Sequence, residues 1–245
     1  MTFRILKLDR CGSTNDVAKE MARAGAAEGT AVVALEQTAG RGTKGRTWYS
    51  SRGHGLYVSV LLRPHSADLL PLLPLAAGLA ARAAVERVAG LSAGLRWPND
   101  IVWKGRKLGG LLCETAFAGA VVEYAVVGLG LNLTHEEADF PAGLRDFAVS
   151  VRRAGGRSAE ADEILEAYLA ELGERSSALA GGRASRLVED FESFSVLKPG
   201  DAVAIDTSEG VLRGTYRGIA ADGTLPLDFP SGERRFSSGD IIRLV

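Results

Sequence analysis

Hydrophobic residues alternate in some stretches of the chain and recur at helical spacing in others, which predicts a combination of strands and helices. Alternating or continuous apolar runs are typical of strands, and stripes with a period of three to four residues are typical of helices. Strands are expected at residues 3–8, 30–36, 56–62, 95–103, 107–117 and 121–133. Helices are expected at residues 13–24, 74–88, 158–179 and 187–194. The predicted fold class is therefore α+β, with a mixed β-sheet flanked by helices.

The pattern changes near residue 195, where helices give way to short alternating strands separated by turn residues. These strands are expected at residues 202–206, 211–219, 224–228, 234–236 and 241–245. The Asp-Gly and Ser-Gly pairs between them are typical of hairpin turns. The sequence thus predicts two domains, a larger one at residues 1–194 and a small β-barrel at residues 195–245.

Composition narrows the class of protein. The 245 residues carry a net charge of -1, with 24% charged and 46% apolar residues, which is ordinary for a soluble protein and gives no reason to expect general nucleic-acid binding. Cys11 and Cys113 do not form a disulfide framework, and three scattered histidines do not suggest a zinc site. The N-terminus lacks a secretion signal and no apolar run looks long enough to span a bilayer, so we expect a cytoplasmic protein without a membrane partner.

A cationic glycine loop is the most informative segment. Between Gly40 and Arg46, three glycines and three cations share seven positions. Glycine lets backbone N–H groups approach a ligand closely, and arginine adds a fork that matches phosphate or carboxylate oxygens. The alternative is a solvated hairpin loop. A nucleotide-binding P-loop is rejected, because the segment after Trp48 leads into a strand and not into a helix.

Two further segments combine glycine with polar residues. Trp97-Pro98-Asn99-Asp100 precedes a hairpin turn at residues 104–106, and Gly109-Gly110 then weakens the next strand unless something packs closely against it. Gly128 and Gly130 clear one face of the following strand, where a flat ligand or another backbone could lie. Ser13 and Asp16 fit the acidic form of a capping box at the start of a helix.

In this order, the motifs resemble those of the biotin protein ligase family. They are Ser13-Thr14-Asn15, Gln37–Gly42 with Gly45, Arg46 and Trp48, Trp97–Asp100, Lys107–Leu112 with Glu114, and Gly128–Asn132. The resemblance covers about residues 5–133, and the C-terminal strands also fit the family. It implies a catalytic domain like that of class II aminoacyl-tRNA synthetases and biotin ligases, followed by an SH3-like barrel.

The resemblance implies a two-step reaction with biotin and ATP as substrates. The carboxylate of biotin joins the α-phosphate of ATP to give biotinyl-5′-AMP and pyrophosphate, and a lysine of a carrier protein then attacks the carbonyl. Because the first step brings two anions together, cations and Mg²⁺ must neutralise them. Arg41 and Lys107 are the catalytic candidates that the resemblance indicates.

The resemblance also assigns the remaining site residues. Biotin is expected to contact Ser13, Thr14, Asn15, Gln37, Gly40, Arg41, Gly42, Thr43, Lys107, Gly109 and Gly110. ATP and the adenylate are expected to contact Arg41, Arg46, Trp48, Asn99, Lys107, Gly130 and Asn132. Asp100 is the candidate Mg²⁺ contact. The Gly40–Arg46 loop is expected to close over the adenylate and protect the mixed anhydride from water.

One residue departs from the family pattern. The family loop usually reads Gly-Arg-Gly-Arg, and Thr43 stands where the second arginine is expected. A threonine supplies neither the charge nor the fork of that arginine. Either Lys44 compensates, or the adenylate leaks from the site and biotinylates unrelated proteins.

The resemblance leaves several assignments open. Some family members carry an N-terminal helix-turn-helix domain, but here the catalytic motifs begin at Ser13, so we expect no DNA binding. The expected partner is a biotin carboxyl carrier protein or domain, and a homodimer is a further expectation. The alternatives are a lipoate or octanoate transferase of the same fold and a non-catalytic biotin or adenylate sensor.

Overall fold

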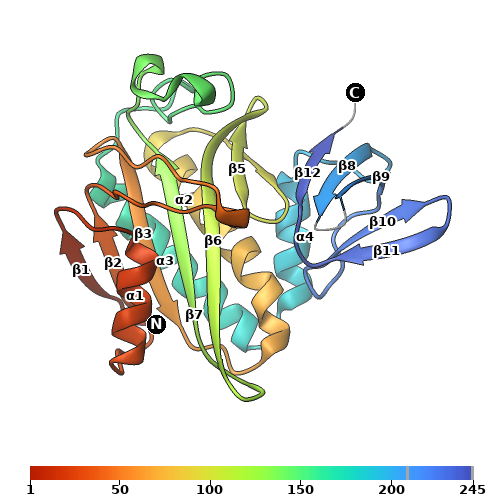
Figure 1. The fold of residues 1–245 in the computed structure, drawn as a ribbon, viewed down its shortest axis with the longest axis horizontal. Coiled ribbons are helices and arrows are strands. Elements are labelled where there is room, and N and C mark those ends of the chain that lie inside the picture. The colour runs from red at the N-terminus through yellow and green to blue at the C-terminus, as the bar shows by residue number, and fades with distance from the viewer. Residues whose placement is uncertain (208–209, 244–245) are drawn as a thin grey trace.

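The computed structural model describes residues 1–207 and 210–243, which form two β-sheets with helices packed against the larger one (Figure 1). The larger sheet has the strand order β1-β2-β3-β7-β6-β5-β4. Its strands are β1 (Arg4–Leu8), β2 (Thr30–Ala34), β3 (Gly55–Leu62), β4 (Gly94–Arg96), β5 (Asp100–Trp103), β6 (Arg106–Ala118) and β7 (Val121–Asn132). β1 and β2 pair in parallel and the other neighbours are antiparallel, so the sheet is mixed, as predicted.

Helices cover both faces of this sheet. They are α1 (Thr14–Arg23), α2 (Leu73–Ala89), α3 (Ala161–Ala180) and α4 (Ala184–Phe194), with short 3-10 turns η1 (Thr43–Gly45), η2 (Ala67–Leu72), η3 (Glu137–Asp139) and η4 (Ala142–Leu144). Successive residues of a strand point to opposite faces. Val58 and Val127 therefore join the large core with α2 and α3, whereas Leu61 and Val126 pack against Ala18 of α1 (Figure 1). The α1 face is the less fully covered one, and it holds the cavity described below.

The most apolar helical stretch, residues 67–89, lies inside the protein. By length and composition it could cross a membrane, but 67% of its most apolar window is buried in the fold. Leu75, Leu79 and Val85 are all at most 2% exposed. The core helices of water-soluble proteins can be as long and as apolar as this one, and they are buried in the same way.

The C-terminal β-domain is a five-stranded antiparallel sheet with the order β11-β10-β9-β8-β12, consistent with the predicted SH3-like fold. Its strands are β8 (Ala202–Thr207), β9 (Gly210–Tyr216), β10 (Leu225–Phe229), β11 (Gly232–Phe236) and β12 (Asp240–Arg243). The indole N–H of Trp97 donates to the carbonyl of Gly223 at 3.0 Å, which joins the two sheets. The core continues across this junction to Val203 and Tyr216. The division at 194/195 therefore stays a prediction.

Two sequence predictions of local structure are wrong. Residues 95–103 form two short strands, β4 and β5, because the chain turns at Trp97-Pro98 and β5 pairs back on β4. Ser13 does begin α1, but its side chain makes no cap hydrogen bond. Asp16 points its carboxylate at Arg41 instead of closing a capping box. The last expected strand extends to residues 244 and 245, which lie outside the described residues.

Candidate active site

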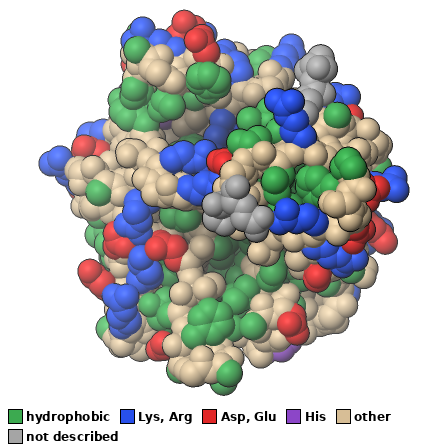
Figure 2. All heavy atoms as spheres, turned by 45° about the vertical axis from the view of Figure 1, so that its right-hand side comes forward, with side chains coloured by type: hydrophobic (Ala, Val, Ile, Leu, Met, Phe, Trp, Pro, Cys, Tyr) green, Lys and Arg blue, Asp and Glu red, His purple; other side chains and the backbone are tan. Residues whose placement is uncertain are grey.

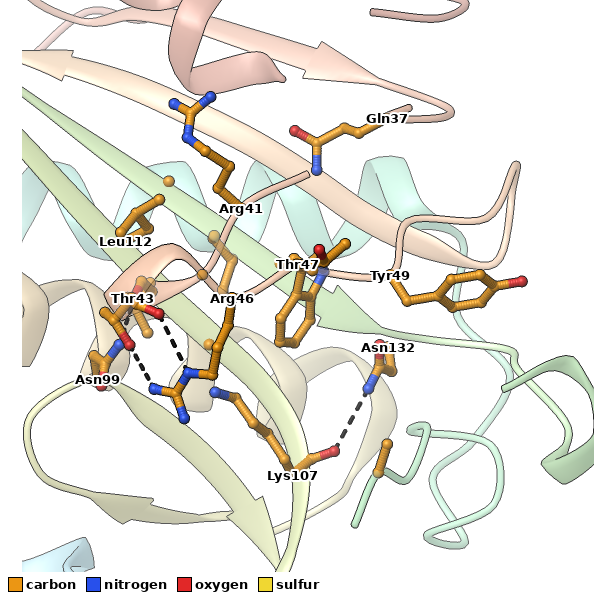
Figure 3. Close-up of a pocket in the computed structure, with 18 of the residues that line it drawn as sticks. Gln37, Arg41, Thr43, Arg46, Thr47, Tyr49, Asn99, Lys107, Leu112 and Asn132 are labelled. Atoms are coloured by element: carbon orange, nitrogen blue, oxygen red, sulfur yellow. Dashed lines mark hydrogen bonds between the residues drawn. The ribbon is translucent and has the colours of Figure 1, made fainter. Parts of the chain in front are cut away.

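A cavity of about 220 Å³ lies on the α1 face of the larger sheet (Figure 3). Its walls come from the start of α1, the cationic loop, strands β6 and β7, and the segment after β7. The lining residues are Ser13, Thr14, Asn15, Gln37, Arg41, Gly42, Thr43, Arg46, Thr47, Trp48, Tyr49, Asn99, Lys107, Gly110, Leu111, Leu112, Gly128, Leu129, Gly130, Asn132, Phe140, Leu144, Phe147 and Ala148. In the space-filling view, basic and hydrophobic side chains border a hollow on one face of the molecule (Figure 2).

One end of the cavity is a buried hydrogen-bond network. Gln37 Oε1 accepts from the Thr14 backbone N–H at 2.8 Å and from the Thr14 hydroxyl at 3.0 Å. The amide of Gln37 donates to Ser50 Oγ at 2.9 Å. The Ser59 hydroxyl is fully buried, 2.7 Å from Thr14 Oγ1 and 2.5 Å from Asn15 Oδ1. Locked donors and acceptors of this kind suit the polar ring of a ligand and hold their rotamers without one.

Beside this network, two cations share two carboxylates. The Arg41 guanidinium pairs with Asp16 and lies 3.0 Å from Glu114 Oε2. Lys19 lies 3.0 Å from Asp16 and 2.7 Å from Glu114, and the amide of Asn15 also donates to Glu114. The cluster is therefore charge-balanced, and each carboxylate has two cationic partners.

The pKa values of the carboxylates follow from these contacts. The hydrogen bond from Arg41 lowers the pKa of Asp16 to about 2. Burial by itself would raise the pKa of Glu114, but hydrogen bonds from Lys19 and Asn15 outweigh it and lower that pKa. Both groups thus stay ionised at neutral pH, and Arg41 meets an arriving anion only in competition with two carboxylates.

At the middle of the cavity, the indole of Trp48 lies over Gly110 of β6 and Gly130 of β7, which carry no side chains. A Cβ built on Gly130 would meet Trp48 Nε1 at 2.3 Å, and one on Gly110 would meet Trp48 Cζ3 at 3.4 Å. A Cβ on Gly128 would meet Asn15 Oδ1 at 2.2 Å. The cleared strand face is thus covered by side chains of the protein itself, and not by another backbone. The buried Nε1 of Trp48 has no hydrogen-bond partner among the described residues.

Lys107 occupies the opposite wall. Its Nζ lies 2.5 Å from Asp100 Oδ1 and 5.5 Å from the centre of the Trp48 ring. Asp100 also accepts from Arg96 at 2.6 Å, so this carboxylate keeps a cationic partner when Lys107 turns to a ligand. A Cβ on Gly110 would come within 2.9 Å of Lys107 Cε, so a side chain there would push the end of the lysine aside.

The segment after β7 forms a wall that the sequence did not predict. The Lys107 backbone N–H donates to the Phe147 carbonyl at 2.7 Å, and the Lys107 carbonyl accepts from Val149 at 3.0 Å. The Asn132 amide donates to the Val149 carbonyl at 3.2 Å. Asn132 therefore holds this wall in place and also lines the cavity. Apolar side chains of the segment, among them Phe140, face the same space.

The cationic loop directs its charges to three places. Figure 3 shows the Arg41 guanidinium turned away from Arg46 and Lys107, toward α1. Arg46 donates to the carbonyl and hydroxyl of Thr43 at 3.2 and 2.8 Å, within the cavity wall. Lys44 points outward, to carboxylates of the C-terminal β-domain. Lys44 is not among the described residues that line the cavity, and its compensation for the missing arginine stays a prediction.

Most residues expected at the site do line the cavity, and three do not. Gly40, Gly109 and Asp100 lie outside the set of described residues that line it. Gly40 supports the loop, since a Cβ there would meet Trp48 O at 2.6 Å, and a Cβ on Gly109 would meet Leu131 on the core side. The roles of the lining residues toward a ligand stay predictions.

Sequence reasoning missed two residues that organise the site. Lys19 follows Asp16 by three residues on α1, so both project from one side of the helix. That spacing is a signal that could have found the pair. Ser59 carries no such signal, because a buried serine in a strand is common. Only its pairing opposite Gly128 brings it to Asn15.

Fold and cavity together define a class of protein. It is a helix-flanked mixed sheet with an appended small β-domain, and its cavity offers hydrogen-bond partners at one end and cations for an anionic group beyond them.

Comparison with known proteins places the chain within this class. Residues 8–132 match the model of the biotin/lipoate A/B protein ligase family, and the chain belongs to that family. It is 34% identical over 244 residues to the bifunctional ligase/repressor BirA of Bacillus spizizenii, covering 98% of this chain and 74% of the relative. It is 32% identical over 243 residues to the biotin–[acetyl-CoA-carboxylase] ligase of Mycobacterium tuberculosis, covering 95% of this chain and 86% of the relative.

A solved structure agrees in fold over nearly the whole chain. The biotin protein ligase of Aquifex aeolicus, in complex with biotin and ATP, superposes with a TM-score of 0.84 at 27% identity, covering 98% of this chain and 99% of that one. The match includes the C-terminal β-domain, so the fold expected for a biotin ligase is confirmed.

Proposed function

We propose that this protein is an ATP-dependent biotin–protein ligase that forms biotinyl-5′-AMP and transfers biotin to a lysine of a biotin carboxyl carrier protein. The observation that carries the proposal is the cavity, which joins a polar network around Thr14 and Gln37 to a region bordered by Arg46 and Lys107. The network suits the ureido ring of biotin, which both donates and accepts hydrogen bonds. The cations suit the carboxylate and the phosphates.

In the first step, an oxygen of the biotin carboxylate attacks the α-phosphorus of ATP, and the bond to pyrophosphate breaks. Lys107 and Arg46 would offset the charge that gathers between the two anions. Trp48 and Asn132 would contact adenine. Arg41 would reach the ligand by giving up part of its pairing with Asp16, which keeps Lys19 as a partner.

Mg²⁺ would accompany ATP and neutralise part of the phosphate charge. No group of three His, Cys, Asp or Glu side chains among the described residues could hold a metal ion without other ligands. Mg²⁺ bound with nucleotides needs only one or two carboxylates, because phosphates and waters supply the rest. Asp100, the candidate from the sequence, would have to give up its pairing with Lys107 to take that role.

In the second step, the amine of a carrier lysine attacks the carbonyl carbon, AMP leaves, and the amine loses a proton. A carboxylase carrier is the partner that the relatives support, since one is named a biotin–[acetyl-CoA-carboxylase] ligase. A cytoplasmic location, a homodimer and the absence of DNA binding and of a membrane partner stay parts of this proposal. The near-neutral net charge of -1 supports the last two.

Pyrophosphate release tests the proposal. The full chain is mixed with Mg·ATP and either biotin, lipoate or octanoate, with no carrier present. Release with biotin alone supports the ligase. Binding of lipoate or octanoate in place of biotin, without release, would instead support the acyl-transferase alternative. Biotin binding without any release would identify a sensor, and a protein that binds none of the three would contradict the proposal.

A further inference from the structure

The tip of the cationic loop is tied to the C-terminal β-domain by Lys44, which the proposed chemistry does not use, and by Arg46, which it does. Lys44 Nζ lies 2.8 Å from both the carbonyl and the Oδ2 of Asp206, and 3.0 Å from Oδ2 of Asp240. Arg46 donates to the other oxygen of Asp240 at 2.7 Å. Two loop cations thus share one carboxylate of the opposite domain, and a second carboxylate also holds Lys44. We call this set of contacts the loop clamp.

Asp240 is the centre of the loop clamp. Its side chain is 30% exposed, against 50% for Asp206. Burial alone would raise the pKa of Asp240, but hydrogen bonds from Arg46 and Lys44 lower it. Asp240 is therefore ionised throughout the neutral range, and the clamp does not depend on pH there.

The clamped tip is connected rigidly to the parts of the loop that meet the cavity. The backbone N–H of Gly42 donates to the Arg46 carbonyl at 2.7 Å, and that of Trp48 donates to the Gly40 carbonyl at 2.9 Å. The segment is thus a small hairpin, and its two legs carry Arg41 and Trp48. Because these hydrogen bonds join the legs to the tip, restraint of the tip also restrains the legs.

The backbone of Lys44 supports a role for its side chain. Lys44 has φ 56° and ψ 32°, a left-handed conformation that is uncommon for residues other than glycine. Such a conformation persists where the surroundings hold it. The contacts of the Lys44 ammonium group with Asp206 and Asp240 provide that restraint, and they account for a lysine at a position that backbone preference would give to glycine.

We propose that Asp206 and Asp240 are positioning residues that hold the cationic loop closed over the reaction intermediate and so set how slowly it escapes. This inference rests on the proposed function, because the intermediate is biotinyl-5′-AMP. A closed loop excludes water from the mixed anhydride. Partly exposed ion pairs are individually weak, so the clamp can still open to admit substrates. The clamp also compensates, from outside the cavity, for the absence of the arginine expected at the position of Thr43.

The release rate of the intermediate is the direct test. Biotinyl-5′-AMP is formed in the full chain from labelled biotin and Mg·ATP, and a chase of unlabelled biotin follows its loss. Asp206→Asn/Asp240→Asn should release it roughly three- to tenfold faster than wild type, the effect expected of networked surface ion pairs. Higher salt should speed release from wild type but hardly from this variant. Asp228→Asn is the control, since it breaks a pair with Arg217 that involves no loop residue.

Lys44→Gln removes the Lys44 contacts of the clamp from the loop side and leaves the Arg46–Asp240 pair, without touching a residue that lines the cavity. It should speed release by less than the double variant, and combining it with the double variant should add little, because the double variant already removes the carboxylates that Lys44 contacts. This second route keeps the test decisive if the double variant does not fold. Fully additive effects would overturn the clamp.

Hydrogen exchange separates failure of the clamp from failure of the proposed function. The backbone amides of Gly42 and Trp48 should exchange faster in the Asp206→Asn/Asp240→Asn variant than in wild type, whether or not catalysis occurs. Unchanged exchange and release in a folded variant would overturn the clamp. A wild type that releases no pyrophosphate would overturn the ligase, and faster exchange in the variant would then still support the clamp as a device that positions the loop.

Discussion

The indole of Trp48 lies so close to Gly130 that a Cβ at that glycine would come within 2.3 Å of the indole nitrogen. Gly130 is paired with Gly110 on β6 and with Tyr57 on β3, in the interior of the sheet. The glycine is therefore needed for space, and the indole for covering the sheet at the middle of the cavity. This contact links the cationic loop to the strand that ends in Asn132.

Gly130→Ala should displace Trp48 and weaken ATP binding. Overpacking of this kind costs about 1–3 kcal/mol, so we expect the KM for ATP to rise roughly 5- to 150-fold while biotin binding changes little. Steady-state pyrophosphate release at varied ATP measures this. Gly143→Ala is the matched control, because a Cβ there meets no atom within 4 Å. An unchanged KM for ATP in a folded Gly130→Ala variant would show that the indole does not bear on the nucleotide.

Lys107→Ala should abolish most adenylate formation. Removing one preorganised electrostatic group from a reaction centre lowers kcat on the order of 10²–10³-fold. Asp100 keeps Arg96 as a partner, so the fold should be retained. Single-turnover pyrophosphate release measures the loss. Lys104→Ala on the same hairpin is the control, since that lysine lies over the Trp103 ring and lines no part of the cavity. Equal activity in the two variants would remove Lys107 from the chemistry.

Ser59→Ala should loosen the polar end of the cavity. The substitution leaves Asn15 Oδ1 without a buried partner, which costs about 1–3 kcal/mol, whereas Thr14 Oγ1 keeps its hydrogen bond to Gln37. We expect a lower free energy of unfolding and weaker biotin binding, measured by urea denaturation and calorimetry. Ser193→Ala, on the exposed side of α4, is the comparison. Biotin affinity equal to wild type would mean that the network is structural and does not orient the ligand.

His135 predicts a loss of stability toward acid. It is fully buried beside Phe140, with a ring separation of 4.7 Å, and burial followed by the nearby charge of His54 lowers its pKa to about 4. Between about pH 6.5 and pH 4 the unfolded chain binds a proton that the native ring refuses. The free energy of unfolding should therefore fall with pH in that window, by up to about 3 kcal/mol from this residue.

The measurement is urea denaturation at pH 7 and pH 4.5 for wild type and His135→Phe. In the variant, the free energy of unfolding should fall less steeply between pH 7 and pH 4.5, because the contribution of His135 is gone and those of the other groups remain. His65→Gln, an exposed histidine, should leave the slope as in wild type. An identical pH slope in wild type and His135→Phe would contradict a neutral buried ring.

The local sequence was sufficient to predict the elements whose structure depends on residues that are neighbours along the chain. Alternation and helical spacing predicted the strands from residue 107 to 133 and the long helix that is α3, because burial of one face imposes those periods. The glycine loop and the Lys107 segment were expected at the site because the resemblance rests on those motifs. Gly109 shows the limit, since adjacent residues of a strand face opposite sides and a motif does not say which side is the cavity.

The sequence by itself determined the family, the mixed architecture and most residues that line the cavity, because all of these lie in contiguous motifs or simple periods. Tertiary structure alone decided which side chains meet. It placed Ser59 beneath Asn15, turned Arg41 to Asp16, laid Trp48 on Gly130, and directed Lys44 to Asp240 across 196 residues of chain. Contacts between segments distant in sequence depend on strand register and domain packing, which no local pattern encodes.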